Sequence, residues 1–286
     1  AFPSDPVQRR VRIIDSARRT GRTPYGGKGE GTGITEECPE PREQEEGPRR
    51  PLLFACLVLA VIAGFLALDH FSGFTAQLAL GAATWLVLLA SCAPLGADQR
   101  ARVALVVLVA TSAEVLGSVI LGAYTYRLEN LPAFVPPGHG LVYLGGLAIS
   151  QSALVRRHRR TFLVAVGAVV AAWAAIGLVA LGRTDALGAL AGALLIYVLV
   201  RGRAPTLYAG VFLIVAFLEI YGTSIGAWHW AQTVPGTPLP AGNPPSGIAS
   251  IYVLFDISAI ALAPRLLAGF RSFRRLPPLA RFANAS

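Results

Sequence analysis

Three acidic residues lie inside long apolar stretches of the sequence: Glu114, Glu219 and Asp256. A charged side chain at the centre of a membrane costs a few kcal/mol, so such residues usually face the interior of a helix bundle and serve a function. Removal from water favours the neutral form of a carboxyl group, which can donate a proton. We therefore treat these three residues as candidate catalytic acids. A purely structural, hydrogen-bonding role is the alternative.

Two of these acids open copies of one motif. The shared pattern is Glu-x-x-Gly-[Ser/Thr] followed by Gly-Ala-aromatic-x-aromatic, with one residue of slip between residues 114–126 and residues 219–230. A Pro-rich segment follows each copy, at 136–140 and 243–247. Because the matching residues are rare ones in apolar sequence, the pattern indicates an internal duplication. Small residues one turn after each acid would let another helix approach closely.

Four aromatic residues end the two copies: Tyr124, Tyr126, Trp228 and Trp230. Aromatic residues often form a belt where helices leave the membrane, and their ring faces can also stabilise a cation. On a helix, residues two apart point about 200° away from each other, whereas an extended backbone puts both on one side. We expect these four residues to contact a substrate, with the aromatic belt as the alternative.

His139 and Asn243 lie in the two Pro-rich segments, which we expect to be outer loops, and both are further candidates for substrate binding. The spacing of His, Cys and acidic residues fits no common metal site. The sequence also has no phosphate-binding loop and no nucleophile elbow. It therefore predicts neither a metal nor a cofactor.

The elements that must position these residues are membrane helices. Hydrophobic residues make up 54% of the chain and charged residues only 14%, whereas about a quarter of a soluble protein is charged. This composition excludes a soluble enzyme. Stretches of about 20 apolar residues are long enough to cross a bilayer. The sequence predicts an all-α polytopic membrane helix bundle of about eight transmembrane helices, at 52–68, 74–95, 102–123, 140–155, 161–181, 186–200, 206–227 and 248–268. Seven helices with one re-entrant segment is the alternative.

The net charge of +9 is a signal of orientation. With the N-terminus inside, nearly all basic residues beyond residue 50 fall on the inner side, and the outer side receives only Arg127 and Arg183. This asymmetry predicts a multi-pass protein of the cell membrane with both termini in the cytoplasm. Arginines spread over every inner loop argue against a nucleic-acid partner. The remaining acids, Asp69, Asp98, Glu129 and Asp185, are expected to be solvated in loops or at helix ends.

The domain organisation follows from these patterns. Residues 1–50 are rich in Gly, Pro, Arg and Glu and predict a disordered cytoplasmic tail. Residues 51–160 and 161–270 form two four-helix membrane repeats, and residues 271–286 form a basic cytoplasmic tail. Four helices return the chain to its starting side, so the two repeats run parallel. Frequent Arg and Ala with a single Lys suggest a bacterial chain. Membrane lipids are the expected partners, and the oligomeric state is not predicted.

The motif at Glu114–Tyr126 and Glu219–Trp230 resembles motifs in membrane proteins of bacterial carotenoid biosynthesis, of the carotenoid hydratase type. The chain as a whole resembles bacterial multi-pass membrane proteins. The resemblance implies acid-catalysed addition of water to a double bond of an isoprenoid substrate.

Three functions fit these residues. An intramembrane enzyme acting on an isoprenoid or another lipid would use Glu114 or Glu219 as the acid, and Asp256 could position water. On straight helices the aromatic residues lie far above the acids, so the chain would have to fold back. A proton-coupled transporter of small molecules would use the same acids as proton carriers. In a non-catalytic scaffold they would be structural.

Overall fold

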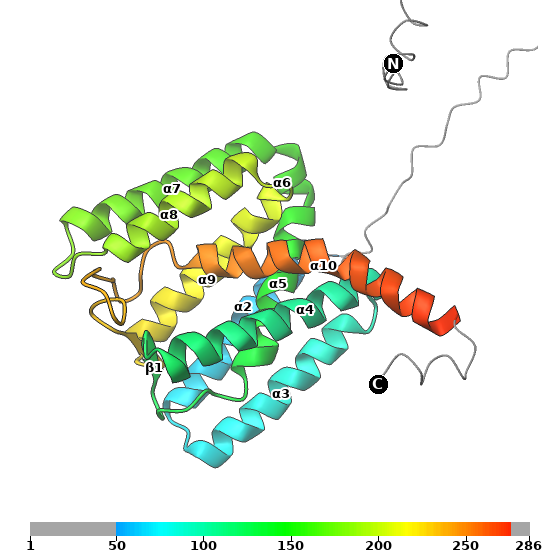
Figure 1. Cartoon of the computed structure of the whole chain (residues 1–286), viewed down its shortest axis with the longest axis horizontal. Coiled ribbons are helices and arrows are strands. Elements are labelled where there is room, and N and C mark those ends of the chain that lie inside the picture. Colours follow the sequence, from blue (N-terminus) through cyan, green and yellow to red (C-terminus); the bar gives the residue numbers. More distant parts are fainter. Residues whose placement is uncertain (1–49, 276–286) are drawn as a thin grey trace, which may run out of the picture. The chain divides into compact units, whose positions relative to one another are not determined.

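The computed structural model describes residues 50–275, and the side chains of that range up to residue 269 (Figure 1). The predicted tail over residues 1–50, apart from Arg50, lies outside the described residues. So does most of the predicted C-terminal segment 271–286. The last helix continues to Arg275, five residues into that segment.

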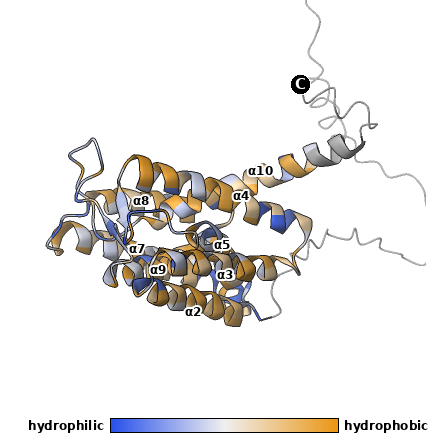
Figure 2. Cartoon of the chain, turned by 90° about the horizontal axis from the view of Figure 1, so that it is seen from below, coloured by the Kyte–Doolittle hydropathy of each residue, from blue (hydrophilic) through white to orange (hydrophobic). Residues whose placement is uncertain are grey.

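A helix covers each of the eight apolar stretches. Six of these helices are long and apolar enough to cross a membrane, whereas two, with 17 and 16 residues, are shorter. The outward-facing surfaces of the helices are strongly apolar (Figure 2), as expected for contact with lipid. The chain is therefore a multi-pass membrane protein. The helices are α2 (Pro51–His70), α3 (Phe74–Cys92), α4 (Ala97–Glu114), α5 (Val135–Gln151), α7 (Arg159–Val179), α8 (Ala186–Arg201), α9 (Pro205–Ser224) and α10 (Ala249–Arg275), with a short α6 (Ala153–Arg157).

Helix α5 lies at the centre of the bundle. It packs against α2, α3, α4 and α9, and most of its residues are buried. Its contact with α9 depends on glycine. A Cβ atom on Gly210 would lie 2.6 Å from the carbonyl oxygen of Gly146, so the two backbones touch there. Helix α10 packs against α4 (Figure 1).

The chain folds back on itself after α4 and again after α9. Helix α4 continues as a π-helix, η1 (Val115–Ile120), and then turns at Gly122 with φ 65° into strand β1 (Tyr124–Tyr126). Helix α9 turns at Gly226 with φ 71° into strand β2 (Trp228–Trp230). Both turns require glycine, since other residues seldom adopt positive φ. Of the helical and extended backbones considered for the aromatic pairs, the extended one is therefore correct.

The two strands pair with each other. They form an antiparallel two-stranded sheet in which Tyr124 lies opposite Trp230 and Tyr126 lies opposite Trp228. The middle residues of the strands, Thr125 and His229, form the central pair and are exposed. The two copies of the sequence motif thus meet directly, across this sheet.

The prediction that Asp185 is solvated is wrong. Asp185 is 0% exposed and begins helix α8 as its N-terminal cap. Its carboxylate accepts three backbone N–H groups, from Gly188 and Gly242 at 2.8 Å each and from Ser246 at 2.7 Å. Loop N–H groups that are buried need an acceptor, and this carboxylate supplies it. Asp185 thereby fixes the loop that follows β2.

Asp69 is buried for a similar reason. Its Oδ1 accepts a hydrogen bond from Gln77 Nε2 at 2.9 Å and lies 3.6 Å from the guanidinium of Arg127. Arg127 also donates to the backbone carbonyl of Asp69, and Arg183 donates to the backbone carbonyl of Ala231. The two arginines that the sequence places on the outer side therefore fasten loops to one another.

Candidate functional site

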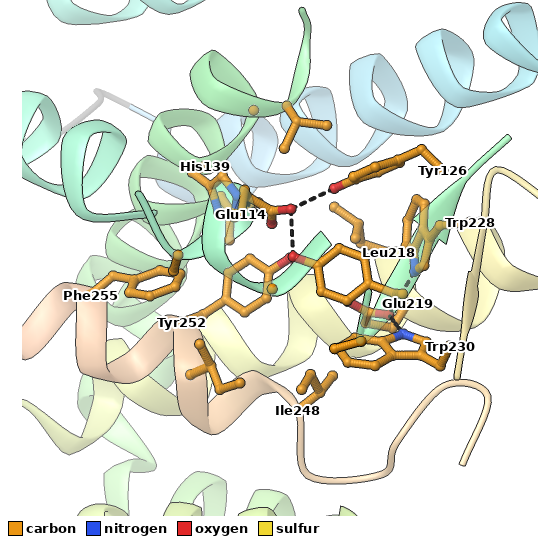
Figure 3. Close-up of a pocket in the computed structure, with 18 of the residues that line it drawn as sticks. Glu114, Tyr126, His139, Leu218, Glu219, Trp228, Trp230, Ile248, Tyr252 and Phe255 are labelled. Atoms are coloured by element: carbon orange, nitrogen blue, oxygen red, sulfur yellow. Dashed lines mark hydrogen bonds and ion pairs between the residues drawn. The ribbon is translucent and has the colours of Figure 1, made fainter. Parts of the chain in front are cut away.

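A mostly apolar cavity of about 410 Å³ lies between α4, η1, α5, α9, α10 and the two strands (Figure 3). Cavities of this size are typical of sites for small organic ligands. The polar and aromatic side chains on its wall come from both halves of the chain. They include Glu114, Tyr124, Tyr126, His139, Glu219, Trp228, Trp230 and Tyr252.

Glu114 accepts hydrogen bonds at both of its carboxyl oxygens. Tyr124 donates its hydroxyl to Oε2 at 2.6 Å, and Tyr126 donates to the same oxygen at 2.8 Å. Nε2 of His139 lies 3.0 Å from Oε1. The Glu114 side chain is buried, at 7% exposure of the residue. The first carboxyl group is thus held from β1 and from α5 at once (Figure 3).

Glu219 accepts hydrogen bonds at one oxygen only. The indole Nε1 groups of Trp228 and Trp230 both donate to its Oε2, at 3.0 and 3.1 Å. Within the described part of the chain no donor forms a hydrogen bond to its Oε1. The residue is 3% exposed. The second carboxyl group is therefore as buried as the first, but only half of its acceptor capacity is used.

The strands explain why both aromatic residues of a motif reach the same carboxyl group. Alternate residues of a strand lie on one face, so the rings of Tyr124 and Tyr126 both project to the side where Glu114 lies. The four rings also contact one another across the sheet. The Tyr124 and Trp230 centroids are 4.6 Å apart, and those of Tyr126 and Trp228 are 6.1 Å apart. Tyr126 and Trp228 are buried, so the alternative of a lipid-facing aromatic belt is wrong for them.

The glycines after the acids make room for these rings. The sequence had instead indicated that they make room for another helix. A Cβ atom on Gly222 would overlap the indole of Trp228. The equivalent atom on Gly117 would lie 3.1 Å from the ring of Tyr124, which is close but less severe. The motif is thus a local unit, in which helix, turn and strand bring acid and aromatic residues together.

The slip of one residue between the two motifs has a structural basis. Glu114 precedes Tyr124 by ten residues, and Glu219 precedes Trp228 by nine. The extra residue lies in η1, where backbone hydrogen bonds span one residue more than in an α-helix. Leu121 N–H binds the carbonyl five residues back, whereas Ile225 N–H binds the carbonyl four back. The π-helix absorbs the insertion, so both aromatic pairs reach their acids.

Two predicted site residues lie away from the cavity. Asp256 on α10 is 2% exposed and interacts electrostatically with Tyr208 of α9, but it does not line the cavity. Within the described residues its Oδ2 has no hydrogen-bond partner. The side chain of Asn243 accepts the backbone N–H of Trp230 at 2.9 Å and so supports strand β2 from outside the cavity.

His139 lies in a helix and not in an outer loop as predicted. Helix α5 begins at Val135, since proline is well suited to the first turn of a helix. Sequence reasoning missed the contribution of Tyr252 to the cavity. Its ring centroid is 5.0 Å from that of His139 and 5.8 Å from that of Phe255, which also lines the cavity. The spacing of Tyr252 and Phe255, three residues apart on a helix, was the available signal.

The exposed part of the cavity wall, its rim, is mostly apolar, with Thr233 as a polar member. Leu116, Leu121 and Ile251 line the cavity and are also exposed on the surface of the bundle. Two of them belong to segments that cross the membrane, and Leu121 directly follows one. A ligand could therefore reach the carboxyl groups from the lipid side without crossing a polar surface.

Burial raises the pKa of Tyr124 and of Tyr126 well above the ordinary value, and the charge of Glu114 raises both further. Both residues therefore remain hydroxyl donors over the physiological range. Across residues 50–269 no group of three or more His, Cys, Asp or Glu side chains is arranged to hold a metal ion. Comparison with known protein families, with curated proteins and with solved structures finds no match for this chain.

Proposed function

We propose that this integral membrane protein is an enzyme that protonates a carbon–carbon double bond of an isoprenoid or another unsaturated lipid. One observation carries the proposal. Two buried carboxyl groups, Glu114 and Glu219, line a single apolar cavity whose wall also contains the four aromatic rings of β1 and β2.

The chemistry of alkene protonation fits this arrangement. The reaction needs a carboxylic acid kept neutral in a dry site, and it produces a carbocation that aromatic ring faces stabilise. The objection that the aromatic residues lie far above the acids does not apply, because β1 and β2 fold back to them. Addition of water to the cation would give an alcohol, which is the reaction that the resemblance to carotenoid hydratases implies.

The apolar rim supports a lipid as the substrate. A substrate dissolved in the bilayer would pass Leu116, Leu121 and Ile251 and would meet the carboxyl groups within the membrane. A water-soluble substrate would gain no hydrogen bonds from these side chains. The apolar lining would likewise favour a hydrocarbon chain over a polar solute.

The same proposal includes two parallel repeats of four helices, eight membrane crossings in all, and cytoplasmic termini in a cell membrane. Two pairs of helix contacts support the repeats, although the contact of α2 with α5 has no matching contact of α7 with α10 of similar extent. If the four long helices of each half are matched in order, α3 corresponds to α8, α4 to α9, and α5 to α10. The contact of α4 with α10 then corresponds to that of α9 with α5, and the contact of α3 with α5 to that of α8 with α10. The strand register is unchanged when the two halves are exchanged, because the first residue of each strand lies opposite the last residue of the other. The inner arginines support the orientation.

The experiment is expression in a bacterial host that produces acyclic isoprenoids, followed by mass spectrometry of the lipid extract. The chain should yield a product heavier than its precursor by one water molecule. Glu219→Gln and Glu114→Gln should lose this product, while Asp98→Asn, which changes an exposed carboxyl group, should retain it. An extract identical to that of the empty host would contradict the proposal. Proton-coupled uptake into vesicles would then separate a transporter from a scaffold.

A further inference from the structure

We propose that the two carboxyl groups have opposite roles in this reaction. Glu219 carries the proton that is given to the substrate, whereas Glu114 is a carboxylate that accepts a proton from water, with His139 as its positioning residue. This inference rests on the proposed function and adds a division of labour to it.

The hydrogen bonds of the two groups differ in number and in length. Glu114 accepts two hydroxyl groups at 2.6 and 2.8 Å, and an imidazole nitrogen lies 3.0 Å from its other oxygen. Glu219 accepts two indole N–H groups at 3.0 and 3.1 Å, on one oxygen. Hydrogen bonds donated to a carboxylate stabilise its charged form. Glu114 is therefore the better carboxylate, and Oε1 of Glu219 is free to carry a proton.

His139 increases the difference. Its Nδ1 is buried and has no hydrogen-bond partner within the described residues. A buried N–H group without an acceptor is costly, which places the ring proton on Nε2, directed at Glu114. With this tautomer Glu114 accepts three hydrogen bonds. Among the described residues, Glu114 is the only hydrogen-bond partner of the His139 ring, which otherwise contacts the rings of Tyr252 and Phe255.

Without a bound cation, electrostatics favour a single negative charge in the cavity. The titratable groups that face Glu114 are Tyr124 and Tyr126 from β1, His139 from α5, Tyr252 from α10 and Glu219 from α9. None of the residues that line the cavity is a lysine or an arginine. Two carboxylates on one apolar cavity repel each other, so the group with fewer donors retains its proton.

The atoms and charges of this reaction balance with the alkene and water as the only reactants. The O–H bond of Glu219 breaks as the π electrons of the alkene form a C–H bond, which leaves a carbocation and the Glu219 carboxylate. The oxygen of a water molecule forms the C–O bond, and its proton passes to the Glu114 carboxylate. Transfer of that proton from Glu114 back to Glu219 restores the starting state. The sum is an alkene and water converted into an alcohol.

Infrared difference spectroscopy of the purified full-length protein, without substrate, tests the assignment. The buried carboxyl group of Asp256, whose Oδ2 has no hydrogen-bond partner within the described residues, is first removed by an Asp256→Asn background. In that background a protonated carboxyl band that shifts in D₂O should be lost in Glu219→Gln and kept in Glu114→Gln, which should lose carboxylate absorption instead. His139→Phe should gain a protonated carboxyl band, because Glu114 loses a donor. His139→Gln, which can still donate, should resemble the wild type. A merely structural role of His139 would not produce this pattern.

Loss of the protonated band in Glu114→Gln, or its retention in Glu219→Gln, would overturn the inference. If a Gln variant fails to fold, Trp230→Phe and Tyr124→Phe replace it. Trp230→Phe should shift the frequency of the protonated band, and Tyr124→Phe should leave it unchanged. A shift in Tyr124→Phe without one in Trp230→Phe overturns the assignment. These spectra are independent of turnover. Correct spectra without a lipid product would refute the proposed function alone, and a lipid product with reversed spectra would refute the division of labour alone.

Discussion

Glu114 and Glu219 occupy equivalent places in two copies of one motif, yet their surroundings differ in kind. Hydroxyl groups and an imidazole bind the first, and indole N–H groups bind the second. A hydroxyl or an imidazole can both donate and accept a hydrogen bond, whereas an indole N–H only donates. The first half of the site can therefore exchange protons, and the second can hold a carboxyl group without exchanging them through its neighbours.

The backbone that carries these groups is nearly the same in both halves. Each half has a helix, a glycine turn at Gly122 or Gly226, and a strand whose outer two residues face the acid. The comparison shows that two similar backbone arrangements can present different donors to a buried carboxyl group. The following experiments compare matched changes in the two halves.

The largest difference is expected when each acid is replaced by its amide. Glu219→Gln should lower the rate of product formation about 10³-fold because the proton donor is lost, and Glu114→Gln about 10²-fold because water can still add slowly without a base. The measurement is the initial rate of formation of the hydrated lipid in membranes with equal protein content. Equal losses in the two variants would argue that the halves are chemically equivalent.

The capping acids provide the next comparison. Asp185→Ala leaves three buried N–H groups without an acceptor and should lower the free energy of unfolding by about 3 kcal/mol. Asp69→Ala removes one hydrogen bond and a longer ion pair and should cost less, about 1 to 2 kcal/mol. Unfolding in detergent, followed by circular dichroism, gives both values. A larger loss for Asp69→Ala would show that the connection between α2 and α3, and not the loop after β2, limits stability.

The glycines should respond unequally as well. Gly222→Ala forces the Trp228 indole away from Glu219 and should cost about 2 kcal/mol. Gly117→Ala meets Tyr124 at 3.1 Å and should cost less than about 1 kcal/mol. Tryptophan fluorescence reports the displacement of Trp228 directly. An unchanged emission spectrum in Gly222→Ala would contradict the tight fit of the ring.

The smallest expected effect is the pH dependence that the two tyrosines of β1 contribute. An unfolded tyrosine ionises near pH 10, whereas burial raises the pKa of Tyr124 and of Tyr126 in the folded protein. The stability that these hydroxyl groups contribute is therefore present below about pH 10 and is lost as the pH rises further. The fall in melting temperature above that pH should be smaller in Tyr124→Phe/Tyr126→Phe than in Trp228→Phe/Trp230→Phe.

Much of the fold could be predicted from the sequence, because apolar length determines where membrane helices lie. Each of the eight apolar stretches is a helix, and the duplicated motif identified both carboxyl groups of the cavity. The orientation and the number of crossings stay predictions. The buried positions of Asp69 and Asp185 could not be predicted, because several of the groups that they bind, such as Arg127 and the N–H groups of Gly242 and Ser246, are brought to them by tertiary contacts.

The geometry of the site was partly visible in the sequence. An aromatic-x-aromatic pattern after a glycine is typical of a turn and a short strand, and this would have placed Tyr124 and Tyr126 on one side. The pairing of β1 with β2 and the position of His139 depend on helix packing. Asp256 has the same sequence signal as the two glutamates, and only the packing of α10 shows that it lies away from the cavity.

The π-helix also sets how the protein can tolerate changes in length. Deletion of one residue within η1 would let this segment become α-helical and match the spacing of the second half, so the first half should survive it. The connection from α9 to β2 contains no such extra residue. Deletion of one residue there would turn Trp228 and Trp230 to the opposite face of the strand. Natural variation in length should therefore be found after the first acid and be absent after the second.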